Sequence, residues 1–430
     1  MGTKITVSGA LVLATFFANP TPAQTVDYDA EIANLTSRPD VQRALRLAEA
    51  LDTLTISNQM LLTEIAAPPF KEEIRAQRYA EMLREAGADS VWIDAEGNVI
   101  ALRRGRSGGK TVALDAHLDT VFPEEIDVSV RQVGDTLFAP GVGDDTRGLA
   151  VVLTVLHAMN QADIETEADV LFIGTVGEEG LGDLRGVKAL FGPNGPGIDS
   201  WIAVDGLALD RNTHSGLGSH RYRVTFKGPG GHSWGHFGRA NPHHAMGRAI
   251  TLFVDQADAF TRDGPRTSYN VGRIGGGTSV NSVPFESWME VDMRSISPER
   301  LIQIDTLLQG AIRQALQEAN EMKRRDDALT VDVDLVGQRP SGSIAVTTPV
   351  VQRSAAVTRF VGADPAFGTG STDSNVPISL GIPAVTIGGG GGGGGAHSLD
   401  EFFVNDRGYL GVQKALLLLV AEAGLAGLVN

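Results

Sequence analysis

A histidine and an aspartate two residues apart, His117 and Asp119, end an apolar segment that begins at Thr111. The apolar run predicts a buried strand, and residues two apart in a strand point to the same face. An imidazole in such a pair can bind a metal through one nitrogen while the other nitrogen donates to a carboxylate. Alone, so short a pair fits a solvated loop at a strand end better than a metal site, so its interpretation depends on the rest of the chain.

Two neighbouring aspartates, Asp144 and Asp145, lie in the segment GVGDDTRG, just before an apolar helix predicted over 148–159. A carboxylate at the start of a helix caps it by accepting a backbone N–H. Capping needs only one of the two. We therefore expect the other aspartate to bridge cations.

Carboxylates also follow two further apolar strands. ADVLFIGTV leads to Glu178 and Glu179, and WIAV leads to Asp205. Sites in α/β proteins lie beyond the carboxyl ends of strands. Adjacent glutamates repel each other unless a positive charge lies between them, which predicts a metal ligand beside a general base.

The last candidate is His397, which follows a strand predicted over 381–387 and eight consecutive glycines, Gly388–Gly395. Such a run is usually a linker. Between a buried strand and a histidine it predicts instead that the backbone approaches a ligand closely.

Composition narrows the chemistry. The net charge of −16 argues against a nucleic-acid binder, which would present a basic face. The chain has no cysteine, so disulfides, thiolate zinc sites and a cysteine nucleophile are excluded. Any metal must therefore bind to His, Asp or Glu.

The beginning of the chain predicts a signal peptide over 1–23. Lys4 precedes an apolar run over 5–17, and small residues up to Ala23 suit a cleavage site. The run is too short to span a bilayer comfortably, and no membrane span is expected in the mature chain. We expect a secreted or periplasmic protein; an uncleaved amphipathic helix is the alternative.

The order of the expected helices and strands, which must position these side chains, predicts an α/β fold in two domains. Residues 24–209 and 338–430 form the catalytic domain, and residues 210–337 form an insert. The order β-α-β-β-α-β in the insert predicts a four-stranded sheet with two helices. Ser297 and Pro298 mark the start of its second helix.

Taken in order, these motifs resemble the two-zinc exopeptidases and deacylases that include peptidase T, glutamate carboxypeptidase, aminoacylase and succinyl-diaminopimelate desuccinylase. The matching residues are His117-Leu118-Asp119, the segment GVGDDTRG, Glu178-Glu179, Asp205 and His397. The resemblance covers nearly the whole mature chain. It implies a zinc-exopeptidase-like catalytic domain, with a mixed central sheet flanked by helices, and an inserted α+β lid and dimerisation domain.

The resemblance also assigns two divalent metal ions, most simply zinc. Asp144 would bridge them. His117 and Asp205 would complete one metal site, and Glu179 and His397 the other.

Two further roles follow from the same resemblance. Glu178 would be the general base, and Asp119 would orient His117. The peptide bond between Asp144 and Asp145 is expected to be cis.

Substrate contacts are implied as well. His232, at the end of a glycine-rich loop of the insert, would assist the oxyanion. Asn281 and Arg294 would hold a substrate carboxylate, although Arg294 could instead pair with an acidic neighbour and Asn281 could merely make a turn. Ser371 lies in a loop that looks like the peptidase T branch and is also expected to contact substrate.

These features predict a metallopeptidase that cleaves an amide bond near a terminus of a small peptide. A deacylase of N-acyl amino acids is the alternative within the family. A non-catalytic periplasmic binder of peptide or metal is the alternative outside it, and Glu178 argues against that because binding needs no base. The resemblance implies a homodimer formed through the insert, with His232 acting in the partner's site; a monomer that closes on itself is the alternative.

Overall fold

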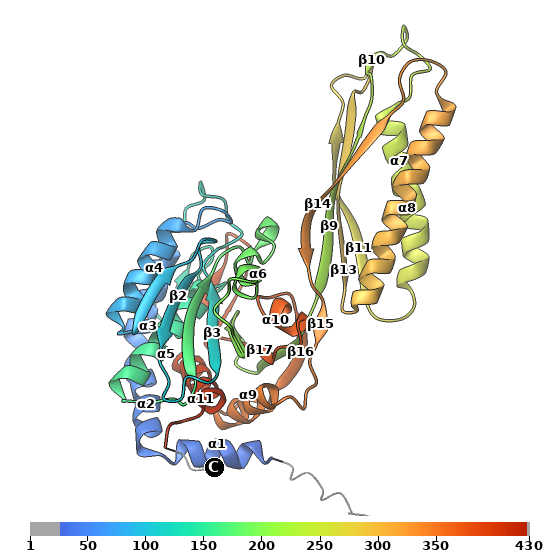
Figure 1. Ribbon diagram of the computed structural model, residues 1–430. Coiled ribbons are helices and arrows are strands. Elements are labelled where there is room, and N and C mark those ends of the chain that lie inside the picture. Colours follow the sequence, from blue (N-terminus) through green and yellow to red (C-terminus); the bar gives the residue numbers. More distant parts are fainter. Residues whose placement is uncertain (1–25, 428–430) are drawn as a thin grey trace, which may run out of the picture.

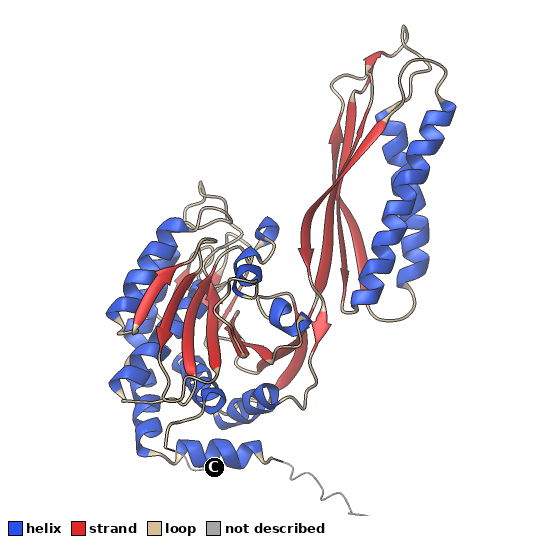
Figure 2. Cartoon of the chain, in the orientation of Figure 1, coloured by secondary structure: helices blue, strands red, loops and turns tan. Residues whose placement is uncertain are grey.

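Figure 1 shows the computed structural model, which describes residues 26–427 and has two lobes. The predicted signal peptide over 1–23 lies outside the described residues. The larger lobe holds a mixed sheet with helices on both faces, and the smaller, elongated lobe holds a sheet with two helices on one face (Figure 2). The predicted α/β fold with a mixed central sheet and an α+β insert is confirmed.

The large sheet has nine strands, in the order β1-β2-β6-β3-β7-β17-β8-β15, with β16 pairing with β8. Its central strands β6, β3, β7 and β17 are parallel to one another. The strands are β1 Ser90–Ile93, β2 Val99–Arg103, β3 Thr111–His117, β6 Asp169–Thr175, β7 Ser200–Val204, β8 Arg211–Gly216, β15 Gly342–Ser343, β16 Ala366–Gly370 and β17 Ala384–Ile387.

Both faces of this sheet are buried because its central strands are apolar on both sides. In β3, Val112 and Leu114 pack into the core under the larger group of helices. Ala113 faces the opposite core, together with Trp201 of β7. Near-continuous apolar runs of this kind are typical of parallel strands covered on both faces.

Helices α1 to α5, α9 and α11 contribute buried residues to the first core, and α6 and α10 to the second. The helices are α1 Tyr28–Thr36, α2 Pro39–Ala50, α3 Asp52–Thr63, α4 Glu73–Glu85, α5 Thr146–Gln161, α6 Arg185–Leu190, α9 Pro349–Phe360, α10 Asn375–Ser379 and α11 Tyr409–Ala423. Among the described residues, no helix combines the length and apolar character needed to cross a membrane.

The small lobe is a four-stranded antiparallel sheet, in the order β11-β13-β9-β14, covered by α7 and α8. Its elements are β9 Gly218–Lys227, β10 Gly231–His232, α7 Pro242–Thr261, β11 Thr267–Gly276, β12 Ser282–Val283, β13 Glu286–Ser295, α8 Pro298–Met322 and β14 Thr330–Arg339. Helix α8 begins as predicted, since the Ser297 side chain accepts the N–H of Arg300. The short strands β10 and β12 lie at the end of this lobe that is far from the large sheet (Figure 1).

Three sequence expectations need correction. The predicted domain boundary at residue 210 falls before β8, which belongs to the large sheet; the small sheet begins at Gly218. The loop expected around Ser371, residues 368–377, contains the end of β16 and the start of α10. Asn375 fixes this segment because its side-chain amide donates to the carbonyls of Leu217 and Pro340.

The glycine run is the third correction. Its backbone packs closely against the protein rather than against a ligand site: a Cβ on Gly388 would lie 2.2 Å from the carbonyl oxygen of Ala208, and one on Gly411 of α11 would lie 1.9 Å from that of Gly389. Part of the run forms β18 (Gly392–Gly394), in a small sheet with β19 Phe402–Val404, β5 Thr136–Phe138 and β4 Arg131–Val133. Gly388, Gly390 and Gly393 are needed because neighbouring backbone atoms leave no room for a side chain there.

Candidate metal centre

Neighbouring parallel strands bring the candidate ligands to one edge of the large sheet. The residues concerned are His117 at the end of β3, Glu178 and Glu179 after β6, Asp205 directly after β7, and His397 beyond the glycine run that follows β17. Because these strands run in the same direction, their carboxyl ends meet, as expected for a site in an α/β protein.

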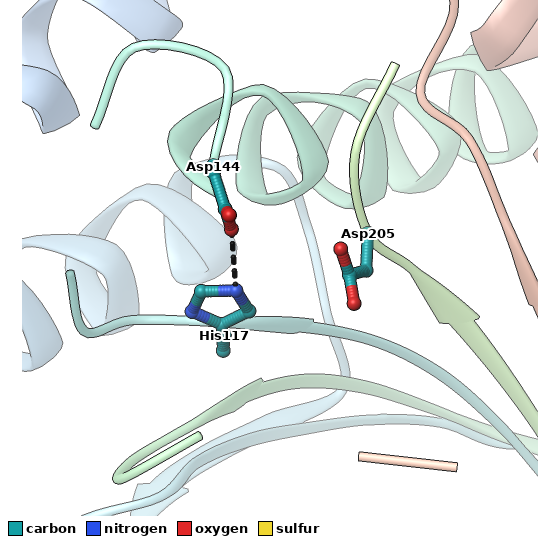
Figure 3. Close-up of side chains that lie close together, drawn as sticks. All are labelled: His117, Asp144 and Asp205. Carbon is teal, nitrogen blue, oxygen red and sulfur yellow. Dashed lines mark hydrogen bonds and ion pairs between the residues drawn. The ribbon is translucent and has the colours of Figure 1, made fainter. Parts of the chain in front are cut away.

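Asp144 lies between the two histidines. Nε2 of His117 is 3.0 Å from Oδ1 of Asp144, the interaction drawn in Figure 3. Nε2 of His397 is 3.2 Å from Oδ2 of Asp144 and 2.8 Å from Oε1 of Glu179. The Asp144–Asp145 peptide bond is cis, as predicted.

Two groups of three residues each bring their ligand atoms within 4.8 Å of one another: His117, Asp144 and Asp205; and Asp144, Glu179 and His397. Asp144 belongs to both groups, and the division is the one that the family resemblance implies. A third group within the same limit, His117, Glu178 and Glu179, places the candidate base beside the ligands. Metal binding by these side chains stays a prediction.

The electrostatics of the site fit cations. Among the described residues, the ion pairs of Asp144 and Glu179 are made only with His117 and His397. Hydrogen bonds to Asp144 and Glu179 raise the pKa of His397 to about 10. Although burial opposes it, the hydrogen bond to Asp144 and the surrounding carboxylates raise the pKa of His117. The carboxylates therefore favour the protonated, positively charged form of both imidazoles. Bound divalent ions would balance the negative charge of the carboxylates in the same way, and zinc accepts nitrogen and oxygen ligands of this kind.

Asp119 is placed differently from the expectation. Nδ1 of His117 is 3.0 Å from the backbone carbonyl oxygen of Asp119 but 3.7 Å from its carboxylate. The carboxylate instead accepts the N–H groups of Glu178 and Glu179, at 3.0 and 2.8 Å. The backbone of Asp119 therefore orients His117, while its side chain holds the segment that carries the base and a ligand.

Asp145 caps the following helix, as one of the two aspartates was expected to do. Its side chain accepts the N–H of Gly148 at 3.1 Å in the first turn of α5. It also accepts the backbone N–H of His117 at 3.1 Å. The buried carboxylate of Asp145 therefore attaches the loop containing Asp144 to the end of β3.

Glu178 is buried and paired with an arginine that the sequence analysis did not single out. Nη1 of Arg339, at the end of β14, lies 3.0 Å from Oε1 of Glu178, and the two side chains are 5% and 6% exposed. Arg339 also donates to the carbonyl of Glu178 and, at 2.9 Å, to Oγ of Ser371. Burial raises the pKa of Glu178 well above its ordinary value, and Arg339 opposes that shift.

Glu401, buried just before β19, holds the loop that carries Asp144. Its carboxylate accepts the backbone N–H groups of Gly141 and Gly143, both at 2.8 Å, and that of Asp144 at 3.0 Å. Since Glu401 follows His397 by four residues, this contact connects the segments of two candidate ligands.

A cavity of about 350 Å³ opens beside the candidate ligands. Arg294 and Ser371 line it, in agreement with the positions expected for substrate contacts. His232 and Asn281 do not; they belong to the far end of the small lobe, where β10 pairs with β12 (Figure 1). Any contact of these two residues with a substrate therefore requires another subunit or a large movement of the lobe.

Arginines are the cavity-lining residues that sequence reasoning missed. Arg211, Arg221 and Arg339 line the cavity together with Arg294. Arg221 and Arg339 lie in alternating polar strands whose arginines are not distinguishable by pattern, and no local motif marks Arg211. Only the folded structure shows which of them line the cavity.

Residues 113–421 match the Peptidase family M20/M25/M40. The chain belongs to this family. Protein YqjE of Bacillus subtilis, an uncharacterised protein, is 26% identical over 306 residues, which are 68% of this chain and 76% of that protein. A Pyrococcus abyssi protein named as a LysW-lysine/LysW-ornithine hydrolase is 36% identical over 129 residues, 30% of this chain and 34% of that protein. Aminopeptidase PepT of Bacillus cereus has the same fold, with a TM-score of 0.67 at 19% identity over 86% of this chain and 98% of that one.

Membership of the M20 family confirms the predicted family and the prediction of an enzyme. The chain is a hydrolase that acts on peptides or amides. Members of this family generally depend on two metal ions, which agrees with the two groups of candidate ligands that share Asp144. The interpretation as a non-catalytic binder is therefore set aside.

Proposed function

We propose that this M20 hydrolase uses two zinc ions to cleave an amide bond near a terminus of a small peptide. The observation that carries the proposal is the pair of ligand groups sharing Asp144, with the additional carboxylate of Glu178 beside them. Three side chains suffice for each group, so Glu178 is left to move protons.

When bound, the two ions would polarise the scissile carbonyl and make a water molecule acidic near neutral pH. Oε2 of Glu178 accepts no hydrogen bond from the described residues, whereas Oε1 is held by Arg339. Oε2 would take the proton of the attacking water and return it to the leaving nitrogen. Arg294, which lines the cavity, would hold a substrate carboxylate.

The test combines metal analysis with a substrate panel. Purified protein should contain two zinc ions per chain and hydrolyse dipeptides or tripeptides, with activity lost to a chelator and restored by zinc. Turnover of N-acetyl amino acids in preference to every peptide would favour the deacylase alternative. Full metal content with no amide hydrolysis across the panel would contradict the proposal.

We also propose export and dimerisation. The residue pattern over 1–23 supports removal of a signal peptide near Ala23, which N-terminal sequencing of the protein made in its host would test. The remote position of His232 supports a homodimer in which the small lobe of one subunit reaches the site of the other. Sedimentation at working concentration would test the dimer.

A further inference from the structure

The cavity beside the candidate metal centre is lined mainly by charged side chains. Four arginines line it: Arg211, Arg221, Arg294 and Arg339. Its acidic lining residues are Asp144, Glu178, Glu179 and Asp205, and three of these are candidate metal ligands. Bound divalent ions would use the charge of those three, so the arginines require separate compensation.

The protein compensates the arginines incompletely. Arg339 pairs with Glu178 in a buried contact at 3.0 Å. Arg221 and Arg294 share a single carboxylate, that of Asp292, through their Nε atoms at 2.9 and 2.8 Å.

The partner of Arg211 is Asp205, at 3.3 Å, which is itself a candidate ligand. With that carboxylate assigned to a metal, Arg211 and one arginine of the Arg221–Arg294 pair have no carboxylate of their own.

The uncompensated arginines also keep donors available. Among the described residues, Nη2 of Arg211, Nη2 of Arg221 and both terminal nitrogens of Arg294 make no hydrogen bond within the protein. Guanidinium groups bind carboxylates through such donors, often in pairs. Two excess positive charges in a partly enclosed cavity attract an anion of matching charge.

Resting on the proposed amide hydrolysis, we infer that the substrate carries two carboxylates, as a peptide ending in glutamate or aspartate, or an N-acyl form of either, does. One carboxylate binds at the Arg221–Arg294 pair and the other at Arg211. A neutral side chain in the same position leaves Arg211 without a partner, which lowers affinity because the cavity still has to desolvate that charge.

The test compares matched acidic and neutral substrates with the zinc-loaded enzyme. We expect kcat/KM for N-acetyl-glutamate and glycyl-glutamate to exceed that for N-acetyl-glutamine and glycyl-glutamine by about 10–100-fold, mainly through KM. Calorimetry without turnover should show glutamate binding more tightly than glutamine by at least about 10-fold. Glutamine and glutamate have nearly the same shape, so the comparison isolates charge.

Substitution then locates the second carboxylate. In Arg211→Gln the preference for glutamate over glutamine should fall to within a few-fold, with the binding difference falling in parallel and zinc content measured alongside. Arg223→Gln is the matched control, because Arg223 lies on the same strand as Arg221 but pairs with Glu290 and does not line the cavity. It should keep the full preference.

The outcomes separate this inference from the proposed function. Equal or faster hydrolysis of the neutral substrates overturns the inference and leaves amide hydrolysis in place. Preference for acidic substrates that persists in Arg211→Gln, with zinc content intact, removes Arg211 from the second subsite. Absence of hydrolysis for all substrates at full zinc content overturns the proposed function itself.

Discussion

Oε1 of Glu401 accepts the backbone N–H of Asp144 at 3.0 Å, although 257 residues separate them in the chain. The same carboxylate accepts two further N–H groups of this loop, so one buried side chain sets the position of the residue shared by both ligand groups. Residues that orient metal ligands in this way typically change metal affinity about 10–100-fold when they are replaced.

We therefore predict that Glu401→Gln binds metal about 10-fold or more weakly. The amide NH₂ group that replaces one carboxylate oxygen cannot accept a hydrogen bond, so at least one backbone N–H of the loop loses its acceptor. Metal retained during dialysis against increasing chelator measures the effect. Asp400→Asn changes the exposed neighbouring carboxylate and should retain metal like the unsubstituted protein. Equal retention by the two variants would show that the loop holds its shape without Glu401.

The second prediction concerns Glu178. Glu178→Gln should keep fold and metal content but lose about 10²–10⁴-fold in turnover, since the amide cannot accept a proton. Circular dichroism, metal analysis and kcat on a hydrolysed peptide check the three parts. A variant with both metals bound and near-full kcat would assign the proton transfer to another group.

Part of this site could be predicted from sequence because two of its candidate ligands lie at the end of an apolar strand or directly after one. His117 and Asp205 need no tertiary information beyond the strand that each one follows. The division into two groups around Asp144 came from the family resemblance and is reproduced by the positions of the side chains.

The contacts that could not be predicted are those between segments distant in sequence. Arg339 reaches Glu178 across 161 residues, and Glu401 reaches Asp144 across 257. Neither pair has a residue spacing or a motif by which it could be recognised in a single sequence. The hydrogen bonds of the Asp119 carboxylate could not be predicted for the same reason, since they come from backbone N–H groups of another loop.

The third prediction follows from the burial of the Arg339–Glu178 pair. Removing one partner of a buried pair leaves an uncompensated charge and typically costs about 3–5 kcal/mol. Arg339→Met should lower the free energy of unfolding by about that amount in urea denaturation of the metal-free protein. Arg359→Met, which breaks the exposed pair with Asp29, should change it by less than about 1 kcal/mol.

A double variant distinguishes the lost charge pair from lost packing. With Glu178→Gln in the background, no carboxylate is left unpaired, so Arg339→Met should cost clearly less than it does alone. The same cost in both backgrounds would mean that Arg339 stabilises the protein by packing and not by pairing with Glu178.

The fourth prediction concerns Lys414, a fully buried lysine of α11 whose Nζ donates to the carbonyls of Leu209 and Arg211, both at 2.8 Å. Burial lowers its pKa to about 7 from the ordinary value of 10.5. Between these two values the unfolded chain holds a proton that the folded chain has lost. The free energy of unfolding should therefore rise with pH in this window, by up to about 1.4 kcal/mol per pH unit.

Urea unfolding from pH 7 to pH 10 tests this, with chelator present so that metal binding adds no pH dependence of its own. Lys414→Met removes the titrating group, and its stability should lack this rising contribution. Parallel pH dependences of the two proteins would show that Lys414 keeps its proton in the fold.

The last prediction tests whether His232 acts in the partner's site. His232 lies at the end of the small lobe remote from its own ligand groups, while Glu178 lies beside them. In a dimer with His232 acting in trans, Glu178→Gln and His232→Ala are inactive separately but complementary when subunits exchange. Half of the dimers are then mixed and each holds one intact site, so about a quarter of the original activity should return. Mixing Glu178→Gln with the double variant Glu178→Gln/His232→Ala gives no intact site and should stay inactive. A protein that sediments as a monomer, or mixtures that remain inactive after exchange is verified with labelled subunits, would place His232 outside the partner's site.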